Sequence, residues 1–99
     1  LGGLPRRVRR GPPADAVGAY LAALDELAEH DPGRARRAPE SPHAHAARAG
    51  LTELGALQAD YALARYGARH LTDAEHRRAL GRWRRLRDRL RRGSLHLRR

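Results

Sequence analysis

The side chains in this sequence that could most readily bind a charged ligand are a run of arginines near its C-terminal end. Residues 81–92, GRWRRLRDRLRR, contain seven arginines and one acidic residue. Guanidinium groups bind phosphate through paired hydrogen bonds, so a row of them is typical of nucleic-acid and membrane surfaces. The same pattern also fits the solvent-exposed side of a helix whose leucines and tryptophan are buried. The rest of the chain decides between these two interpretations.

Six histidines raise the question of a metal site. His43 and His45 are two residues apart at a predicted helix start, where side chains at i and i+2 point to different sides. His70 and His76 are separated by a turn, and the chain has neither a cysteine nor an HExxH motif to complete a ligand set. We therefore predict no metal site and no cofactor, and we expect exposed histidines.

The groups that could support catalysis are few. Ser41 and Ser94 are the only serines in the chain, and neither has a histidine and an acid in a recognisable local signature. Asp25 and Glu29 are spaced as neighbours on a helix, but their position fits a solvated helix face. So small a helical domain rarely builds a pocket of converging polar groups. The sequence therefore predicts no enzyme activity and no small-molecule substrate.

Composition limits the size and class of the domain. The chain of 99 residues is one small domain with a net charge of +10, and all 21 of its basic residues are arginine. Arginine in place of lysine is typical of GC-rich codon usage, which accounts for part of the excess. No stretch of these residues approaches the roughly 20 apolar residues of a membrane span, and none has the pattern of a signal peptide. Because the chain begins at Leu1, we expect it to be a piece of a longer protein.

Residues 1–13, LGGLPRRVRRGPP, form a predicted basic linker, because three prolines exclude a continuous helix. Its cations are Arg6, Arg7, Arg9 and Arg10. Such a cluster is typical of a cytoplasmic segment that follows a membrane span. An anionic membrane surface is therefore a candidate partner of this arm.

Hydrophobic periodicity predicts an all-α bundle of about four helices, two of them short, over residues 14–92. The first helix spans about 14–29. Its predicted apolar stripe consists of Val17, Tyr20, Leu21, Leu24 and Ala28. The second helix, about 42–49, begins with the cap and N-terminal proline of Ser41-Pro42 and ends at Gly50.

The third helix is predicted over about 52–66, with Gly67 as a left-handed stop. The fourth begins with a capping box, Thr72 to Glu75, and continues to about Arg92 before Gly93. Its apolar stripe is Ala79, Leu80, Trp83, Leu86 and Leu90. Residues 93–99 are predicted to be a flexible basic tail.

These stripes define the predicted core. Its members are Val17, Tyr20, Leu21, Leu24, Leu54, Leu57, Tyr61, Leu80, Trp83 and Leu90. Charge is divided unevenly around it, because residues 14–31 sum to −5 and residues 71–99 to +8. We expect the acidic first helix to pair with part of the arginine in the fourth. Trp83 belongs to the apolar stripe, so a stacking platform for nucleic-acid bases is not expected.

Several short motifs follow one another in a characteristic order. They are Tyr20 in the first helix, the Ser41-Pro42 helix start, and Tyr61 followed by Ala64-Arg65-Tyr66-Gly67. In this order, over about residues 17–92, they resemble the protein-glutamine gamma-glutamyltransferase-like C-terminal domain. That domain of unknown function occurs at the C-terminal ends of bacterial membrane-anchored transglutaminase-like proteins and of shorter membrane proteins.

Two details of this resemblance make structural predictions. We expect Tyr66 to pack at the end of the third helix and to hold the turn into the fourth. After the proline, the family usually has a glutamate at the third helical position and often an aromatic next, where this chain has Ala44 and His45. Losing the glutamate removes half of a capping box, so helix 42–49 should be less stable than in relatives.

The resemblance implies a location more than an activity. Such domains follow a transmembrane helix on the cytoplasmic side, and the catalytic cysteine of the transglutaminase-like domain is not in this segment. We therefore expect a non-catalytic cytoplasmic C-terminal domain of a bacterial membrane protein, acting as an interaction or regulatory module with an unidentified protein partner. The alternative is a small arginine-rich nucleic-acid-binding module.

Overall fold

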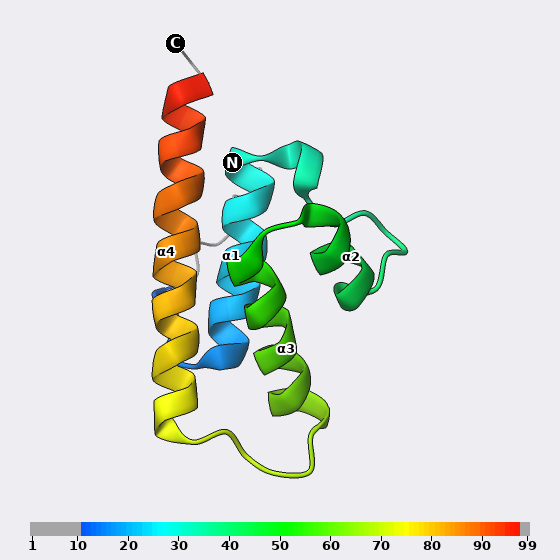
Figure 1. Cartoon of the computed structure of the whole chain (residues 1–99), viewed down its shortest axis with the longest axis vertical. Helices are drawn as coiled ribbons and strands as arrows, with labels where there is room; N and C mark the ends of the chain where they lie inside the picture. Colours follow the sequence, from blue (N-terminus) through cyan, green and yellow to red (C-terminus); the bar gives the residue numbers. More distant parts are fainter. Residues whose placement is uncertain (1–10, 98–99) are drawn as a thin grey trace, which may run out of the picture.

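The computed structural model describes residues 11–97, with side chains to Gly93, and this part of the chain forms four α-helices and no strand (Figure 1). The elements are α1 (Ala16–His30), a 3-10 turn (Pro32–Arg34), α2 (Pro42–Ala49), α3 (Thr52–Tyr66) and α4 (Asp73–Leu97). The prediction of an all-α bundle of about four helices is confirmed.

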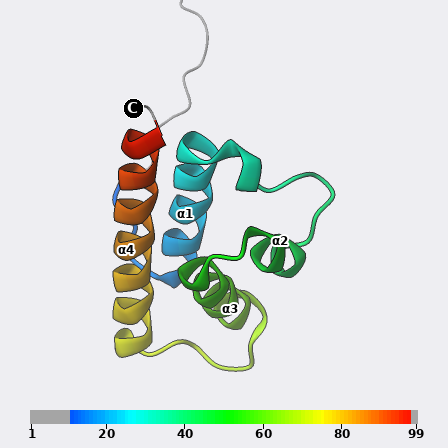
Figure 2. The ribbon, with the colours of Figure 1, turned by 45° about the horizontal axis from the view of Figure 1, so that its top comes forward.

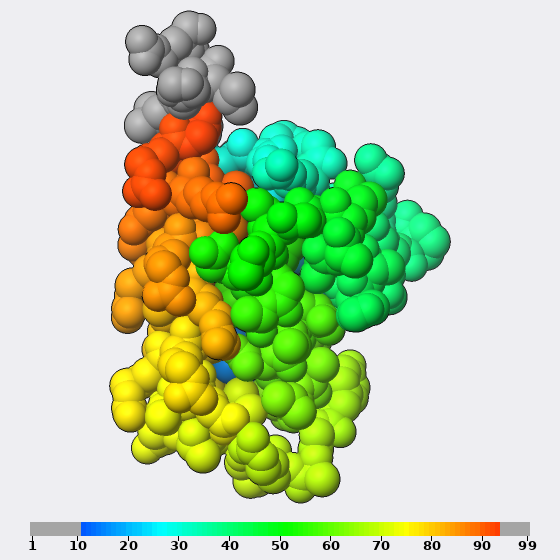
Figure 3. Space-filling view, in the orientation of Figure 1, coloured from blue at the N-terminus to red at the C-terminus, as the bar shows by residue number. Residues whose placement is uncertain are grey.

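Three helices pack around one core, and the fourth is attached at its side. α1 and α4 run side by side, α3 packs against both, and α2 contacts α3 on the side away from α4 (Figures 1 and 2). The space-filling view shows α4, in yellow to orange, along one whole edge of the molecule (Figure 3). One side of α4 therefore faces the bundle and the opposite side faces away from it.

The buried face of α1 is shifted by about one position along the sequence from the predicted face. Asp15 caps the helix by accepting a hydrogen bond from the Gly18 amide at 2.8 Å. The buried stripe is Ala16, Ala19, Tyr20, Ala23 and Leu27. Val17 is half-buried outside the core cluster, and Ala28 is exposed. The prediction was wrong because alanines line the true contact, where their small side chains let neighbouring helices pack closely.

The bounds of α2 and α3 agree with the prediction, and one of the two glycine stops behaves as expected. Ser41 Oγ accepts from the Ala44 amide at 3.1 Å, and Gly50 adopts a left-handed φ of 67°. Gly67 is not left-handed, since its φ is −75°. Glycine is needed there for space, because a Cβ would lie 2.5 Å from the carbonyl oxygen of Leu63.

α4 begins as predicted and ends later. Thr72 and Glu75 form the reciprocal capping box, with hydrogen bonds of 2.7 and 3.1 Å. The helix continues through Gly93 to Leu97, so the predicted stop at Gly93 is wrong, and the last two residues of the predicted tail, 98 and 99, lie outside the described residues. A single glycine inside a helix costs only about 1 kcal/mol, which the long amphipathic helix tolerates.

The core consists mainly of alanine and leucine from α1, α3 and α4. Among the predicted core residues, Tyr20, Leu54, Leu57 and Leu90 are buried. Others pack against the core while partly exposed, namely Leu21, Leu24, Tyr61, Leu80 and Trp83. The fully buried leucines that were not on the predicted core list are Leu27 and Leu86. Leu86 belongs to the predicted stripe of α4, so the inward face of that helix is confirmed.

Polar contacts, rather than a large apolar face, attach α2 to the preceding loop. Arg48 donates to both carboxylate oxygens of Glu40, at 2.7 and 3.0 Å, and to the carbonyl of Ala35 at 2.8 Å. These hydrogen bonds lower the pKa of Glu40 to about 2. His45 is fully buried with Nε2 2.7 Å from the Arg34 carbonyl oxygen, so the prediction of an exposed histidine is wrong here. The loop carbonyl satisfies Nε2, which lowers the cost of burying the ring, whereas Nδ1 is buried without a hydrogen-bond partner among the described residues.

Candidate interaction surface

The arginines of α4 fall into two groups, according to the side of the helix on which they lie. An α-helix turns about 100° per residue, so residues seven apart lie two turns away and project in nearly the same direction. Those beside the apolar stripe face α1 and α3, and those opposite the stripe face away. This division decides which guanidinium groups are free to bind a partner.

The arginines on the flanks of the apolar stripe are paired with acids from neighbouring helices. Arg82 Nη1 donates to Asp60 at 2.8 Å, and Arg89 Nη1 donates to Glu53 at 3.1 Å. The two arginines are seven residues apart, and so are the two acids of the antiparallel helix α3. The spacing of charge on one helix therefore matches its spacing on the other.

A third pair joins α4 to α1, as the charge distribution predicted. Arg91 donates to both carboxylate oxygens of Glu26, at 3.0 and 2.9 Å. These hydrogen bonds raise the pKa of Arg91, because they favour its charged form. The contribution of α3 was not predicted, because the net charge of residues 51–70 is zero and hides the matched spacing of its acids.

The outer face of α4 carries arginines without an acidic partner. Among the residues with described side chains, five exposed arginines of this helix form no ion pair. They are Arg77, Arg78, Arg84, Arg85 and Arg92. They form two rows with a seven-residue period, and successive members of a row are about 10.5 Å apart along the helix. This face has far more positive charge than the fold itself neutralises.

An open hollow of about 390 Å³ lies between these arginines. Its lining residues are Ala74, Arg77, Arg78, Gly81, Arg82 and Arg85. Gly81 forms its floor, because it has no side chain and lies between the arginines at 77 and 78 and those at 84 and 85. A Cβ placed there would be 3.6 Å from Arg85 Nη1, an ordinary contact, so packing alone does not require glycine.

Trp83 lies on the other side of α4, as predicted from the apolar stripe. It packs against the core, its Nε1 is buried without a hydrogen-bond partner among the described residues, and the guanidinium of Arg87 stacks 4.8 Å above its ring. The indole is therefore covered by a cation and turned inward. It does not join the arginines of the outer face.

The aromatic motif residues belong to the core, with one exception. Tyr20 and Tyr61 stack with ring centroids 4.7 Å apart, and Arg65 lies 5.8 Å from the centre of the Tyr61 ring. Tyr66 is 77 % exposed, so the prediction that it packs at the end of α3 is wrong. The turn is instead fixed by Gly67, whose amide donates to the Leu63 carbonyl at 2.9 Å.

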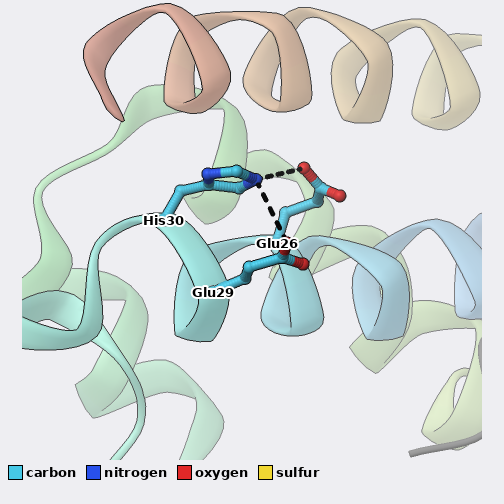
Figure 4. Close-up of side chains that lie close together, drawn as sticks. All are labelled: Glu26, Glu29 and His30. Carbon is cyan, nitrogen blue, oxygen red and sulfur yellow. Dashed lines mark ion pairs between the residues drawn. The ribbon is translucent and has the colours of Figure 1, made fainter. Parts of the chain in front are cut away.

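The structure brings together a group of possible metal ligands that the sequence did not single out. Glu26, Glu29 and His30 place one ligand atom each within 4.8 Å of one another at the end of α1 (Figure 4). His30 Nε2 lies 3.6 Å from Glu26 and 3.9 Å from Glu29. Both oxygens of Glu26 are occupied by Arg91, a cation that repels a metal ion. We assign this group to the ion pairs between α1 and α4.

The histidine pairs considered from the sequence do not come together as ligand sets. His76 Nδ1 accepts a hydrogen bond from the Ala16 amide at 3.0 Å and so connects α4 to the start of α1. His45 is buried under the loop, while His43 and His70 are exposed. His45 and His76 therefore have structural hydrogen bonds that explain their positions.

Comparisons with known proteins return no counterpart. No family model matches the chain, and no curated protein or solved structure is significantly similar to it. The resemblance to the transglutaminase-associated domain therefore rests on the short motifs alone. None of the described helices is long and apolar enough to span a bilayer. The membrane-binding residues predicted in the arm, Arg6, Arg7, Arg9 and Arg10, lie outside the described residues.

Proposed function

We propose that this chain is a non-catalytic interaction domain that binds an acidic partner through the outer face of α4. The observation that carries the proposal is the set of five exposed arginines without an ion pair among the described residues. The other arginines of α4 with described side chains pair with acids, three of them with acids of α1 or α3 and Arg87 with Asp88 of the same helix. Like charges held one or two helical turns apart repel one another and add nothing to the stability of the fold. Binding of a partner that neutralises these charges would account for their presence on this face.

The proposal extends to the cytoplasmic side of a bacterial membrane, as the C-terminal part of a longer membrane protein. Its support is the motif order of residues 17–92 and the four arginines of the arm. Basic residues next to a span remain on the cytoplasmic side and are attracted to anionic lipids. A regulatory module attached to a transglutaminase-like protein, or to one of the shorter membrane proteins, fits this arrangement.

Reporter fusions to the full-length parent test the location. A fluorescent protein that folds only in the cytoplasm is fused to the C-terminus of the parent, and a phosphatase that is active only outside the membrane is fused at the same place. We expect fluorescence in the membrane fraction and no phosphatase activity. An active phosphatase, or a parent found away from the membrane fraction and lacking a span of roughly 20 apolar residues, would refute the proposed location.

The alternative, a small nucleic-acid-binding module, draws on the same arginines. Five phosphate contacts would give a slope of about −4.5 for the logarithm of the duplex-DNA association constant against the logarithm of salt concentration. The inward orientation of Trp83 argues against stacking on single-stranded bases. A duplex titration at several salt concentrations decides, because micromolar affinity at physiological salt with this slope would favour the alternative.

A further inference from the structure

The outer face of α4 repeats the charge spacing by which α4 binds its neighbours inside the fold. Arg82 and Arg89, seven residues apart, pair with Asp60 and Glu53 of α3, which are also seven apart. Arg78 and Arg85 are also seven residues apart, in a row farther from the apolar stripe than Arg82 and Arg89, and Arg92 continues that row. Two antiparallel helices thus already demonstrate in this molecule how a row of arginines on α4 is matched.

Small residues lie where a neighbouring helix would need room. Ala74 and Gly81 are seven residues apart on the outer face and line the hollow of about 390 Å³ between the arginines. Missing or short side chains let the axes of two helices approach more closely, toward about 8 Å. The rows on either side of this hollow then reach the flanks of a helix lying in it. The geometry combines a groove with charges along its edges.

We propose that the outer face of α4 is a docking surface for an acidic helix whose aspartates or glutamates recur every seven residues. This inference rests on the proposed function and specifies its partner. Carboxylates at that spacing, on a helix running along α4, meet Arg78, Arg85 and Arg92 at intervals of about 10.5 Å. Each arginine then has the same kind of partner that Arg82 and Arg89 have within the fold.

One acid within the face favours a helix over a phosphate polymer. Asp88 is exposed among the outer arginines, seven residues after Gly81, and accepts a hydrogen bond from Arg87 Nε at 3.0 Å. A continuous row of phosphates would be repelled at that point, since duplex DNA carries one negative charge per 1.7 Å of its axis. A helix with acids only every seven residues can leave Asp88 free of a like charge, and a register that places an acid beside Asp88 is disfavoured.

The experiment compares two synthetic peptides of equal composition with the 99-residue chain. The first is an alanine-based helix with glutamates at seven-residue intervals. The second has the same glutamates at five-residue intervals, which places successive charges about 140° apart around the helix. Circular dichroism verifies that both peptides are helical, and fluorescence anisotropy measures their affinity at low and at physiological salt. We expect the first peptide to bind about fivefold more tightly than the second.

Matched variants locate the binding face. Removing Arg78, Arg85 and Arg92 by substitution with glutamine should weaken the first peptide about eightfold, at about a factor of two for each exposed pair. The control replaces Arg34, Arg36 and Arg37 of the loop with glutamine, which removes the same charge elsewhere. We expect this control to change the affinity by less than about twofold, which the overall net charge alone would not predict.

A single substitution separates docking from general attraction. Gly81→Leu fills the hollow, and its Cβ meets only the flexible end of Arg85. We expect the variant to bind the first peptide at least about fivefold more weakly while its melting temperature does not fall. An unchanged affinity would show that charge without close approach accounts for the binding.

Three further results would overturn the docking proposal. They are equal binding of the two peptides, undiminished binding by the variant that lacks Arg78, Arg85 and Arg92, and displacement of the peptide by duplex DNA or phosphatidylglycerol vesicles at a lower concentration of negative charge. If the two peptides bind equally and the reporter fusions still place the domain at the membrane, the acidic-helix partner is refuted and the proposed location stands. If the parent lies outside the membrane and the first peptide still binds more tightly, the proposed location is refuted and the acidic-helix partner stands.

Discussion

The two sides of α4 use the same residue type for opposite purposes. On the side that faces the bundle, Arg82, Arg89 and Arg91 each lie within 3.1 Å of a carboxylate from α1 or α3. On the outer side, Arg78 and Arg85 line an open hollow and form no ion pair in the described structure. The difference teaches that arginine content alone does not identify a binding surface, because the fold itself neutralises part of it.

The inner side of α4 stabilises the fold, and the outer side is the proposed binding surface. The inner side supplies apolar burial and ion pairs, so substitutions there should change the free energy of unfolding. The outer side includes Gly81 in the middle of a helix, where glycine lowers helix stability by about 1 kcal/mol relative to alanine. Neither the unpaired arginines nor this glycine improves the fold, so we expect substitutions there to affect binding instead.

The largest expected effect is on the buried leucine of the inner side. Leu86→Ala removes a side chain with 0 % exposure from the core, and this should lower the free energy of unfolding by about 2 to 5 kcal/mol. Arg85→Ala, one residue earlier on the outer side, serves as control and should change it by less than about 0.5 kcal/mol. Urea unfolding measures both. Similar costs for the two variants would mean that α4 is rotated from its described orientation.

A smaller effect is expected at the partly buried ion pair with α3. Asp60, whose side chain is 16 % exposed, binds Arg82. Asp60→Asn should cost about 1 kcal/mol, the upper end for a pair that solvent still screens. A double-mutant cycle with Arg82→Gln isolates the coupling. A coupling energy near zero would indicate that the inner arginines are no better matched than the outer ones.

A gain of stability is expected at the floor of the hollow. Gly81→Ala should raise the free energy of unfolding by up to about 1 kcal/mol, because the new Cβ fits and helix propensity improves. Gly67→Ala should lower it, since its Cβ would collide with the Leu63 carbonyl oxygen. Thermal unfolding of the two variants gives opposite shifts on this account. Destabilisation by Gly81→Ala would assign the glycine to packing and weaken the functional argument.

Acid pH should act on the paired carboxylates and spare the outer face. Arg48 lowers the pKa of Glu40 to about 2 from its ordinary 4.5, so the folded state binds this proton less readily than the unfolded state does. The stability from this pair is therefore present above about pH 4.5 and is lost as the pH falls toward 2. Urea midpoints should fall less steeply over this range in Arg48→Gln than in the wild type. Loss of the arginines at 78, 85 and 92 should leave the pH dependence unchanged, and a flattened profile in that variant would contradict the division.

Local signals predicted the helix ends that depend on a few adjacent residues. Ser41-Pro42 and Gly50 gave both ends of α2, and Thr72 with Glu75 gave the start of α4. These caps work because one side chain satisfies a backbone group three residues away, which requires no tertiary information. The prediction at Gly93 was wrong because a glycine ends a helix only where the following residues leave the helical path.

Tertiary features were predicted less well, for physical reasons visible in particular residues. The face of α1 was assigned partly to Val17 and Ala28, but helix-helix contact selected Ala16, Ala19 and Ala23, whose hydrophobic signal is weak. The burial of His45 depends on a carbonyl group from a distant loop, and the exposure of Tyr66 depends on the path of the turn after α3. The pairing of α3 with α4 was likewise hidden, because equal numbers of acids and arginines concealed the matched spacing.

The most direct test of this account compares two triple variants with equal loss of charge. Arg82, Arg89 and Arg91 are replaced by glutamine in one variant, and Arg78, Arg85 and Arg92 in the other, and urea unfolding at physiological salt gives the free energy of each. We predict a loss of about 1 to 3 kcal/mol for the inner triple and a change within about 0.5 kcal/mol for the outer triple. Equal losses, or a larger loss for the outer triple, would contradict the claim that the outer arginines are reserved for a partner.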